Sequence, residues 1–374
     1  MSRLTLSQSI LEIPFRQAFA HATATRSGTE GLLVKALTSE GGVGMGEGCP
    51  RFYVTGETLA TSQVFFEAHR TTWEQFKNLE DMTNWMTANV QQLDANPAAW
   101  CSVELALLDV WGKESGQTVE TVLGVPELRE PFQYSAVLGT DSLTVFHKQA
   151  TQFSALGFSD FKIKVSGRLN EDRQKIEMLN GLSLEKMRIR LDANNLWKHP
   201  DEAMEYLEAL RYAIWAVEEP LQVNDYEGCR TINRKSGLAI ILDESFLREE
   251  QFQSVQADPQ TWIINIRISK MGGIQRALTV ARQARVAKIP IIIGAQVGET
   301  SILTRAALTV ANQYRDILLA QEGAFGTYLL EHDITDTPLM FGKGGKLDPQ
   351  SLLDRPGLGL TFSKSSETFP PIFC

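Results

Sequence analysis

Phe161-Lys162-Ile163-Lys164-Val165 is the stretch around which the rest of the chain is organised. It reads as a short strand, and because side chains two positions apart share one face of a strand, both lysines point the same way. Two ammonium groups among three apolar residues indicate the wall of a pocket, where burial can lower the pKa of a lysine and make it a base. On these five residues alone, an edge strand with a solvated face is the simpler explanation.

Composition narrows the class of protein. The chain has 374 residues, of which 43% are hydrophobic, and a net charge of −9, which together indicate a globular protein of two domains. The acidic balance excludes nucleic acid as the main partner. Four cysteines without CxxC spacing predict reduced thiols in a cytoplasmic protein. We find no signal peptide and no apolar run long enough to cross a membrane, so we expect no membrane partner.

The first third of the chain predicts an α+β domain. Short apolar runs separated by glycine-rich turns indicate an antiparallel sheet over residues 1–60, and residues 98–111 predict a helix that is buried on most sides. Two segments, 15–31 and 46–53, are expected to be loops. Each is either plain surface linkage or a lid over a site.

The remainder repeats one pattern, an apolar strand-like run followed by a polar turn and a helix-sized connection. The runs cover residues 133–138, 161–165, 187–193, 213–218, 238–244, 262–268, 290–294 and 317–321. Eight such units predict a (β/α)₈-type barrel with one strand-to-helix unit altered. A doubly wound open sheet is the alternative, but no GxGxxG turn follows a strand.

Carboxylates follow three consecutive strands of the predicted barrel, at Asp192, Glu218 and Asp243. A single carboxylate at a strand end is usually the N-cap of the next helix. Three in adjacent strands form a negative cluster that needs a cation. Because no His or Cys accompanies them, the oxygen ligands select a hard ion, Mg²⁺ first and Mn²⁺ next.

Alternation along the strands decides between neighbouring carboxylates. Glu218 shares its face with the small Ala216, so Glu218 is the predicted inward ligand, and the same count selects Asp243 over Glu244. Glu219 and Glu244 are then expected to support the lysines, and Asn194 to lie beside the ligands.

Barrel geometry predicts the chemistry. Strands two and six are opposite in a ring of eight, so Lys164 and Lys270 are expected to face each other across a metal-bound substrate carboxylate. Each would then serve as acid or base on one face of an enolate. Lys162 would neutralise developing charge. Strict alternation along residues 264–270, however, places Lys270 on the face opposite Asn265 and Arg267, which requires either a bulge or a position beyond the strand.

The Lys162-x-Lys164 pair, the three acidic strand ends and Lys270-x-Gly-Gly together resemble the enolase superfamily, and more closely its muconate lactonizing enzyme subgroup. The resemblance covers essentially the whole chain. It implies an α+β capping domain (residues 1–130), a (β/α)₇β barrel (131–340) and a tail returning to the cap (341–374). It also implies Mg²⁺ held by Asp192, Glu218 and Asp243, with Lys164 and Lys270 as the two acid/base groups. A homo-oligomer is expected.

The subgroup includes muconate cycloisomerases, o-succinylbenzoate synthases, N-acylamino acid racemases and dipeptide epimerases, all acting on small carboxylates through the enolate step. We therefore expect an Mg²⁺-dependent isomerase, with a dehydrating lyase, a dipeptide epimerase and a non-catalytic scaffold as alternatives. Dipeptide epimerases usually carry Asp-x-Asp at the eighth strand end to hold a substrate ammonium, whereas this chain reads Gln321-Glu322-Gly323. Candidate substrate contacts are Gln296, Glu322, His21, Arg26 and Tyr53, and solvated loop residues are the alternative for His21 and Arg26.

Overall fold

The structure, a computed structural model, describes residues 3–21, 24–139, 142–182 and 187–363 of the chain. Its largest unit is a parallel sheet of eight strands that pair in chain order. The strands are β7 (Ala136–Leu138), β8 (Asp160–Lys164), β9 (Arg188–Asp192), β10 (Ala216–Glu218), β11 (Ala239–Leu242), β12 (Trp262–Ile266), β13 (Ile291–Ile293) and β14 (Leu318–Gln321). All eight predicted runs therefore contain a strand.

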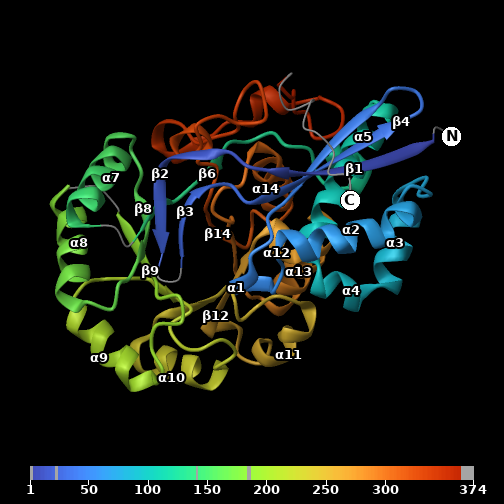
Figure 1. Cartoon of the computed structure of the whole chain (residues 1–374). Coiled ribbons are helices and arrows are strands. Elements are labelled where there is room, and N and C mark those ends of the chain that lie inside the picture. Colours follow the sequence, from blue (N-terminus) through green and yellow to red (C-terminus); the bar gives the residue numbers. More distant parts are fainter. Residues whose placement is uncertain (1–2, 22–23, 140–141, 183–186, 364–374) are drawn as a thin grey trace.

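Helices surround this sheet (Figure 1). They are α7 (Leu143–Ala155), α8 (Leu169–Gly181), α9 (Pro200–Leu210), α10 (Tyr226–Ser236), α11 (Phe252–Val255), α12 (Ile268–Met271), α13 (Ile274–Ala287) and α14 (Ser301–Gln313). The N–H of Ser135, just before β7, donates to the carbonyl of Gln321 in β14 at 2.8 Å and joins the first strand to the last. The eighth strand, β14, is followed by a short 3₁₀ turn, η3 (Gly326–Tyr328), in place of an α-helix. This confirms the predicted (β/α)₇β barrel, in which the last strand has no helix of its own.

The N-terminal part is the predicted mixture of sheet and helices. Strands β1 (Leu4–Leu11), β4 (Gly31–Thr38) and β5 (Val43–Gly48) form an antiparallel sheet in the order β1-β4-β5. Its helices are α1 (Phe52–Thr55), α2 (Leu59–Trp73), α3 (Leu79–Ala88), α4 (Val90–Ala95), α5 (Pro97–Ser115) and α6 (Val119–Leu123). Helix α5 is buried nearly all round, as its sequence predicts. Strand β5 packs directly on it, because a Cβ on Gly46 would lie 2.0 Å from the carbonyl oxygen of Ser102.

Buried carboxylates fasten the N-terminal part to the barrel. Glu47 of β5 accepts the N–H of Thr300 at 2.9 Å and that of Leu303 at 3.2 Å, at the start of α14. Glu104 of α5 accepts the N–H of Gln275 at 3.0 Å, at the start of α13. These contacts satisfy amides that a helix N-terminus leaves without partners, and each is worth about 1 kcal/mol. The barrel and the N-terminal sheet are therefore fixed relative to each other.

The segment expected to be a loop over residues 15–31 instead contains a hairpin. Strands β2 (Pro14–His21) and β3 (Ala24–Gly28) pair antiparallel, with Phe19 opposite Arg26. The N–H of Arg16 donates to the carbonyl of Leu329 at 2.8 Å, which places the base of the hairpin beside the segment that follows β14. Figure 1 shows the hairpin extending in front of the barrel. The small polar residues 21–26 carry no apolar alternation by which a strand is recognised, and the loop prediction extended their pattern to Phe15 and Phe19 before them.

The second expected loop, residues 46–53, is also ordered, because it comprises the end of β5 and the start of α1. The C-terminal segment pairs with both parts of the chain, since β15 (Lys346–Leu347) lies against β6 (Phe132–Gln133). The N–H of Leu358 donates to Asp109 of α5 at 2.8 Å. These contacts join the C-terminal segment both to the start of the barrel and to the N-terminal part. No helix in the described ranges is both long and apolar enough to cross a membrane.

Short 3₁₀ turns complete the description of the chain. They are η1 (Glu249–Gln251), η2 (Pro259–Thr261), η4 (Lys343–Gly345) and η5 (Pro349–Leu352). Turns η1 and η2 flank α11 in the connection between β11 and β12, which has no long helix there. The barrel therefore departs from regular βα alternation next to the strand ends that carry Asp243 and Arg267.

Candidate active site

The inner surface of the barrel is layered by the two-residue period of its strands. One apolar layer consists of Ala216, Ile241, Ile263, Ile292 and Ala320, which cluster together. Two positions further along the same strands come Glu218, Asp243, Asn265, Gly294 and Glu322. Because residues two apart share a face, the polar side chains of the second set point inward at the carboxyl ends of the strands, where barrel enzymes carry their chemistry.

Lys162 lies at the centre of this polar layer. Its Nζ is 3.1 Å from Asp192, 2.8 Å from Glu218 and 3.0 Å from Glu322. Burial alone would lower the pKa of Lys162, but the three carboxylates outweigh it and raise the pKa well above the usual lysine value. Lys162 is therefore a fixed positive charge. The role predicted for it, neutralising charge that develops on the substrate, stays a prediction.

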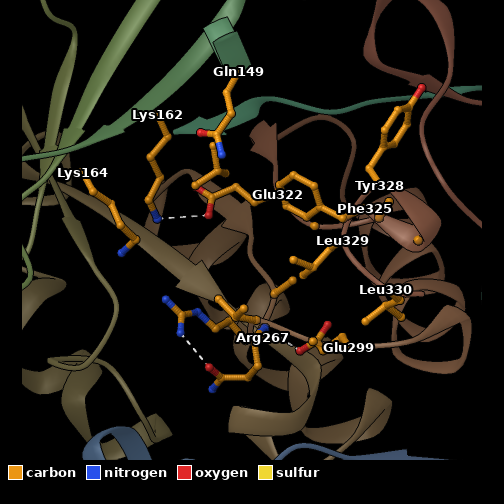
Figure 2. A pocket seen from close by; sticks show the side chains of 18 of the residues that line it. Gln149, Lys162, Lys164, Arg267, Glu299, Glu322, Phe325, Tyr328, Leu329 and Leu330 are labelled. Atoms are coloured by element: carbon orange, nitrogen blue, oxygen red, sulfur yellow. Dashed lines mark hydrogen bonds and ion pairs between the residues drawn. The ribbon is translucent and has the colours of Figure 1, made fainter. Parts of the chain in front are cut away.

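Lys164 lies one step nearer the mouth of the barrel and lines a cavity. Its Nζ donates to Asp192 Oδ2 and to Asn194 Oδ1, both at 2.8 Å. Figure 2 shows Lys162 and Lys164 side by side on the same wall, as alternation in the Lys-x-Lys stretch predicts. Two acceptors hold the Lys164 amine in a defined position at the edge of the cavity.

The three predicted metal ligands end adjacent strands and are all buried. Asp192 pairs with Glu218 in register, and the pKa of Asp192 is lowered because Lys162 and Lys164 outweigh the effect of burial. In this structure, cations of the protein bridge the carboxylates: Lys162 joins Asp192 to Glu218, while Arg267 pairs with Asp243 and lies 4.0 Å from Glu218.

The three carboxylates suit a metal ion by the type of their donor atoms and by their charge. No three His, Cys, Asp or Glu side chains within the described ranges are gathered around a common point. Yet Glu218 Oε2 is buried and lies 2.8 Å from Lys162 Nζ, and the neighbouring carboxylates likewise offer oxygen ligands in the place where the protein's own cations now lie. Three carboxylates without nitrogen or sulfur ligands suit Mg²⁺.

The acidic neighbours of these ligands have different surroundings. Glu219 adopts a positive φ of 39° and accepts hydrogen bonds from the N–H of Asp243 at 2.6 Å and from Ser245 N–H at 2.8 Å. It therefore shapes the end of β11 and contacts neither Lys162 nor Lys164 by hydrogen bond. Glu244 lines the cavity, and burial raises its pKa to about 8.

Lys270 is not brought into the cavity. It lies in α12, beyond the end of β12, and its Nζ donates to the carbonyls of Asp243 and Asn265 and to the Asp243 carboxylate. Burial lowers its pKa to about 7. Arg267 instead lines the cavity and pairs with Asp243, while it donates to Gln296 at 3.0 Å.

The alternation along β12 explains this arrangement. Ile263 belongs to the inner layer, so Asn265 and Arg267 also point inward, whereas Lys270 has the opposite parity and lies outside the strand. Of the two alternatives left open by the sequence, a bulge and a position beyond the strand, the structure has the second. Lys164 and Arg267 therefore line the same cavity, Lys270 does not line it, and the opposed pair of lysines stays a prediction.

The cavity has a volume of about 180 Å³ and two unlike walls. Lys162, Lys164 and Arg267 supply positive charge on one side, whereas Phe325, Leu329 and Leu330 form an apolar wall on the other (Figure 2). The predicted contacts Tyr53, Gln296 and Glu322 line it. Arg26 does not line it and pairs with Glu30 at 2.5 Å, and the side chain of His21 lies outside the described part of the structure.

Several cavity residues were missed by the sequence analysis. Helix α7 contributes a polar and aromatic face that the sequence did not indicate, made of Gln149, Gln152 and Phe153. The segment after the eighth strand, where the sequence placed substrate selection, contributes most of the apolar wall through Phe325, Tyr328, Leu329 and Leu330. Spacing at i, i+3 and i+4 in α7 was the available signal for its face, but the same spacing is typical of any packed helix.

The chain was compared with known proteins. Residues 145–366 match the family model described as "Enolase C-terminal domain-like". The hydrophobic dipeptide epimerase of Enterococcus faecalis is 28% identical over 84% of this chain and 88% of its own. The N-succinyl-L-Arg/Lys racemase of Bacillus cereus is 26% identical over 80% of this chain and 81% of its own. A crystal structure of the E. faecalis enzyme complexed with Mg and the dipeptide L-Leu-L-Tyr has a TM-score of 0.82 at 25% identity, covering 96% of this chain and 99% of that one.

Proposed function

The chain belongs to the enolase superfamily through its enolase C-terminal domain-like barrel, and from this premise we propose that it is an Mg²⁺-dependent enzyme of the racemase and epimerase group. It removes the proton next to the carboxylate of a small organic acid. The family membership confirms the resemblance drawn from the lysines and the acidic strand ends. The relatives named above are epimerases and racemases, which supports an enzyme over a scaffold.

The observation that carries the proposal is the position of Lys164. Its amine lies at the cavity wall, fixed by Asp192 and Asn194, next to the carboxylates that end β9 and β10. A substrate carboxylate drawn to this positively charged end would bring its α-carbon within reach of Lys164. A base in such a position contributes about 10² to 10⁴ in rate.

The metal belongs to the proposal as well. Asp192, Glu218 and Asp243 would hold Mg²⁺, and Mn²⁺ as its substitute, since the same oxygen ligands suit both. When bound, the ion supplies positive charge to the substrate carboxylate and so lowers the cost of removing the adjacent proton. Lys162 holds positive charge beside the same carboxylates, and Arg267 would exchange part of its contact with Asp243 for the substrate side of the cavity.

A second candidate function, the dehydrating lyase, is favoured by Arg267. Inversion at an α-carbon needs a proton donor and a proton acceptor on opposite faces, but an arginine keeps its proton at all ordinary pH values. An elimination needs only one face, on which Lys164 would take the proton and then return it to the departing hydroxide. Arg267 would hold the substrate as a fixed cation in this case.

Proton exchange in D₂O tests the proposal. With Mg²⁺ and N-acylamino acids, dipeptides and cis,cis-muconate as substrates, ¹H NMR should show loss of an α-proton signal or a new product. Lys164→Ala should slow this by at least about 100-fold, whereas Lys77→Ala, at an exposed lysine of the N-terminal part, should not change it. Full activity in Lys164→Ala would refute the assignment of the base.

The product separates the two candidates. Appearance of the opposite enantiomer, measured by chiral chromatography, indicates a racemase or epimerase. Loss of one water from the substrate, measured by mass spectrometry, indicates the lyase.

We further propose a homo-oligomer in the cytoplasm. The cytoplasmic location is supported by Cys49, Cys101 and Cys229, which are buried free thiols and suit a reducing compartment.

A further inference from the structure

Glu322 is the acidic side chain at the eighth strand end, and both of its oxygens are already engaged. Oε2 accepts from Lys162 at 3.0 Å, and Oε1 accepts from Arg190 at 2.7 Å. Arg190 is fully buried inside the barrel, and Lys162 is 1% exposed. Each oxygen of this carboxylate is therefore occupied by a buried donor of the protein itself. Neither oxygen of Glu322 is therefore free to hold an ammonium group of a ligand, although Glu322 lines the cavity.

Arg190 is itself held in place from two other sides. It donates to Asp160 at 2.8 Å and to Ser135 at 3.2 Å, and its guanidinium lies 5.8 Å from the ring centre of Trp215. These contacts keep the guanidinium on Glu322, because moving it away would leave Asp160 without this partner. The cluster of Arg190, Glu322 and Lys162 is thus a rigid part of the cavity wall.

The wall beyond Glu322 carries little charge. Phe325, Leu329 and Leu330 face the cavity there, and α7 adds the neutral amides of Gln149 and Gln152 (Figure 2). An ammonium group placed against this wall would lose its water without gaining a charged partner, which is unfavourable. An apolar group placed there would instead gain from leaving water.

Two other carboxyl groups line the cavity, and neither faces this wall as a free carboxylate. Glu244 is adjacent in sequence to Asp243 and so lies at the proposed metal end. Glu299 accepts the N–H of Gln296 at 2.6 Å, and burial raises its pKa to about 8, so that its carboxyl is mostly protonated near neutral pH.

We infer that the substrate is an N-acylated amino acid with an uncharged, apolar acyl group, selected by the buried Arg190–Glu322–Lys162 cluster against dipeptides that carry a free ammonium. This inference rests on the proposed function, because it takes the carboxylate of the substrate to lie at Lys164. It distinguishes this chain from the E. faecalis relative, whose crystal structure contains the dipeptide L-Leu-L-Tyr.

Matched ligand pairs test the inference on the whole protein with Mg²⁺. N-propionyl and glycyl derivatives of one amino acid have nearly the same shape, but the first ends in a methyl group and the second in an ammonium group. We would measure both by isothermal titration calorimetry, for leucine, phenylalanine, lysine and glutamate in turn. The propionyl compound should bind at least about tenfold more tightly within a pair. Equal binding, tighter binding of the glycyl compound, or no binding of either member of any pair would overturn the inference.

Two variants show which carboxyl group sets the preference. Arg190→Met releases one oxygen of Glu322 and should reduce the preference for the propionyl compound by several-fold. Glu299→Gln should leave the preference unchanged. A preference that is lost in Glu299→Gln and kept in Arg190→Met would assign the selection to Glu299 and overturn the role of the cluster. If Arg190→Met does not fold, the ligand pairs on the unmodified chain still decide the inference.

The same ligands distinguish failure of the inference from failure of the proposed function. Binding reports the substrate class, whereas exchange of the α-proton in D₂O reports the reaction. Selective binding of propionyl compounds without exchange would keep the substrate class and refute the proposed reaction. Exchange that is faster with glycyl compounds would keep the reaction and refute the substrate class.

Discussion

Replacing Glu322 by glutamine tests whether its charge is neutralised inside the barrel. Burial alone would raise the pKa of Glu322, but Lys162 and Arg190 outweigh it and lower the pKa from 4.5 to about 2. Glutamine keeps the shape and one acceptor oxygen but removes the negative charge. The variant therefore leaves Lys162 and Arg190, both buried, without this counter-ion.

The loss of stability expected for Glu322→Gln follows from the pKa of Glu322. A shift of one pKa unit corresponds to about 1.4 kcal/mol, so lowering the pKa from 4.5 to about 2 corresponds to about 3 kcal/mol of stability. This agrees with the range of about 3–5 kcal/mol for removing one partner from a buried ion pair. Because the folded-state pKa lies below the unfolded value, this stability is present above about pH 4.5 and is lost as the pH falls toward 2.

Urea unfolding measures the effect. At neutral pH, Glu322→Gln should lower the free energy of unfolding by about 3 kcal/mol without changing the urea dependence. The gap between the two proteins should narrow as the pH falls below about 4.5, because the wild type then loses its carboxylate charge. Glu331→Gln, the same change at an exposed position, is the matched control and should cost less than about 0.5 kcal/mol. A Glu322→Gln variant as stable as the wild type at neutral pH would refute both the ion-pair argument and its use in the substrate inference.

Two further predictions concern the proposed metal site and the second face of the cavity. Asp243→Asn removes a charged oxygen ligand and should weaken Mg²⁺ binding by about tenfold or more in titration calorimetry; unchanged affinity would exclude Asp243 as a ligand. Arg267→Lys places an amine where the guanidinium now faces the cavity, and a lysine, unlike an arginine, can give up its proton. The fraction of deuterium exchange that yields the inverted product should therefore be larger in this variant than in the wild type. If the wild type already forms the inverted product as fast as it exchanges the α-proton, Arg267 does not prevent proton transfer on both faces of the substrate.

Most of the fold could be predicted because the repeating unit is local. Each barrel strand is a short apolar run, and each connection is long enough for a helix, so eight units could be counted without knowing how they pair. The hairpin β2–β3 could not be predicted in this way. Strand β3 is small and polar, whereas β2 also contains the apolar Phe15 and Phe19. The position of the hairpin depends on contacts with residues near 330 that the local sequence does not reveal.

The site was predictable where the two-residue period alone decides direction, and it was missed where partners are distant in sequence. Lys162, Lys164, Glu218 and Asp243 lie where alternation places them. Along residues 264–270 the same rule places Lys270 on the face opposite Asn265 and Arg267, and the structure has Lys270 in α12, beyond the end of β12. The contact of Arg190 with Glu322 joins residues 132 positions apart, and only the closed barrel shows it.

Depth along the barrel axis separates the roles of the two lysines in the Lys-x-Lys stretch. Lys162 lies in the deeper layer with Arg190 and Glu322, where three carboxylates surround one ammonium and raise its pKa. Lys164, two residues nearer the mouth, contacts one carboxylate and an amide. A step of two residues along one strand therefore separates an ammonium held among carboxylates from a side chain that lines the cavity, which is the basis of the role as base proposed for Lys164.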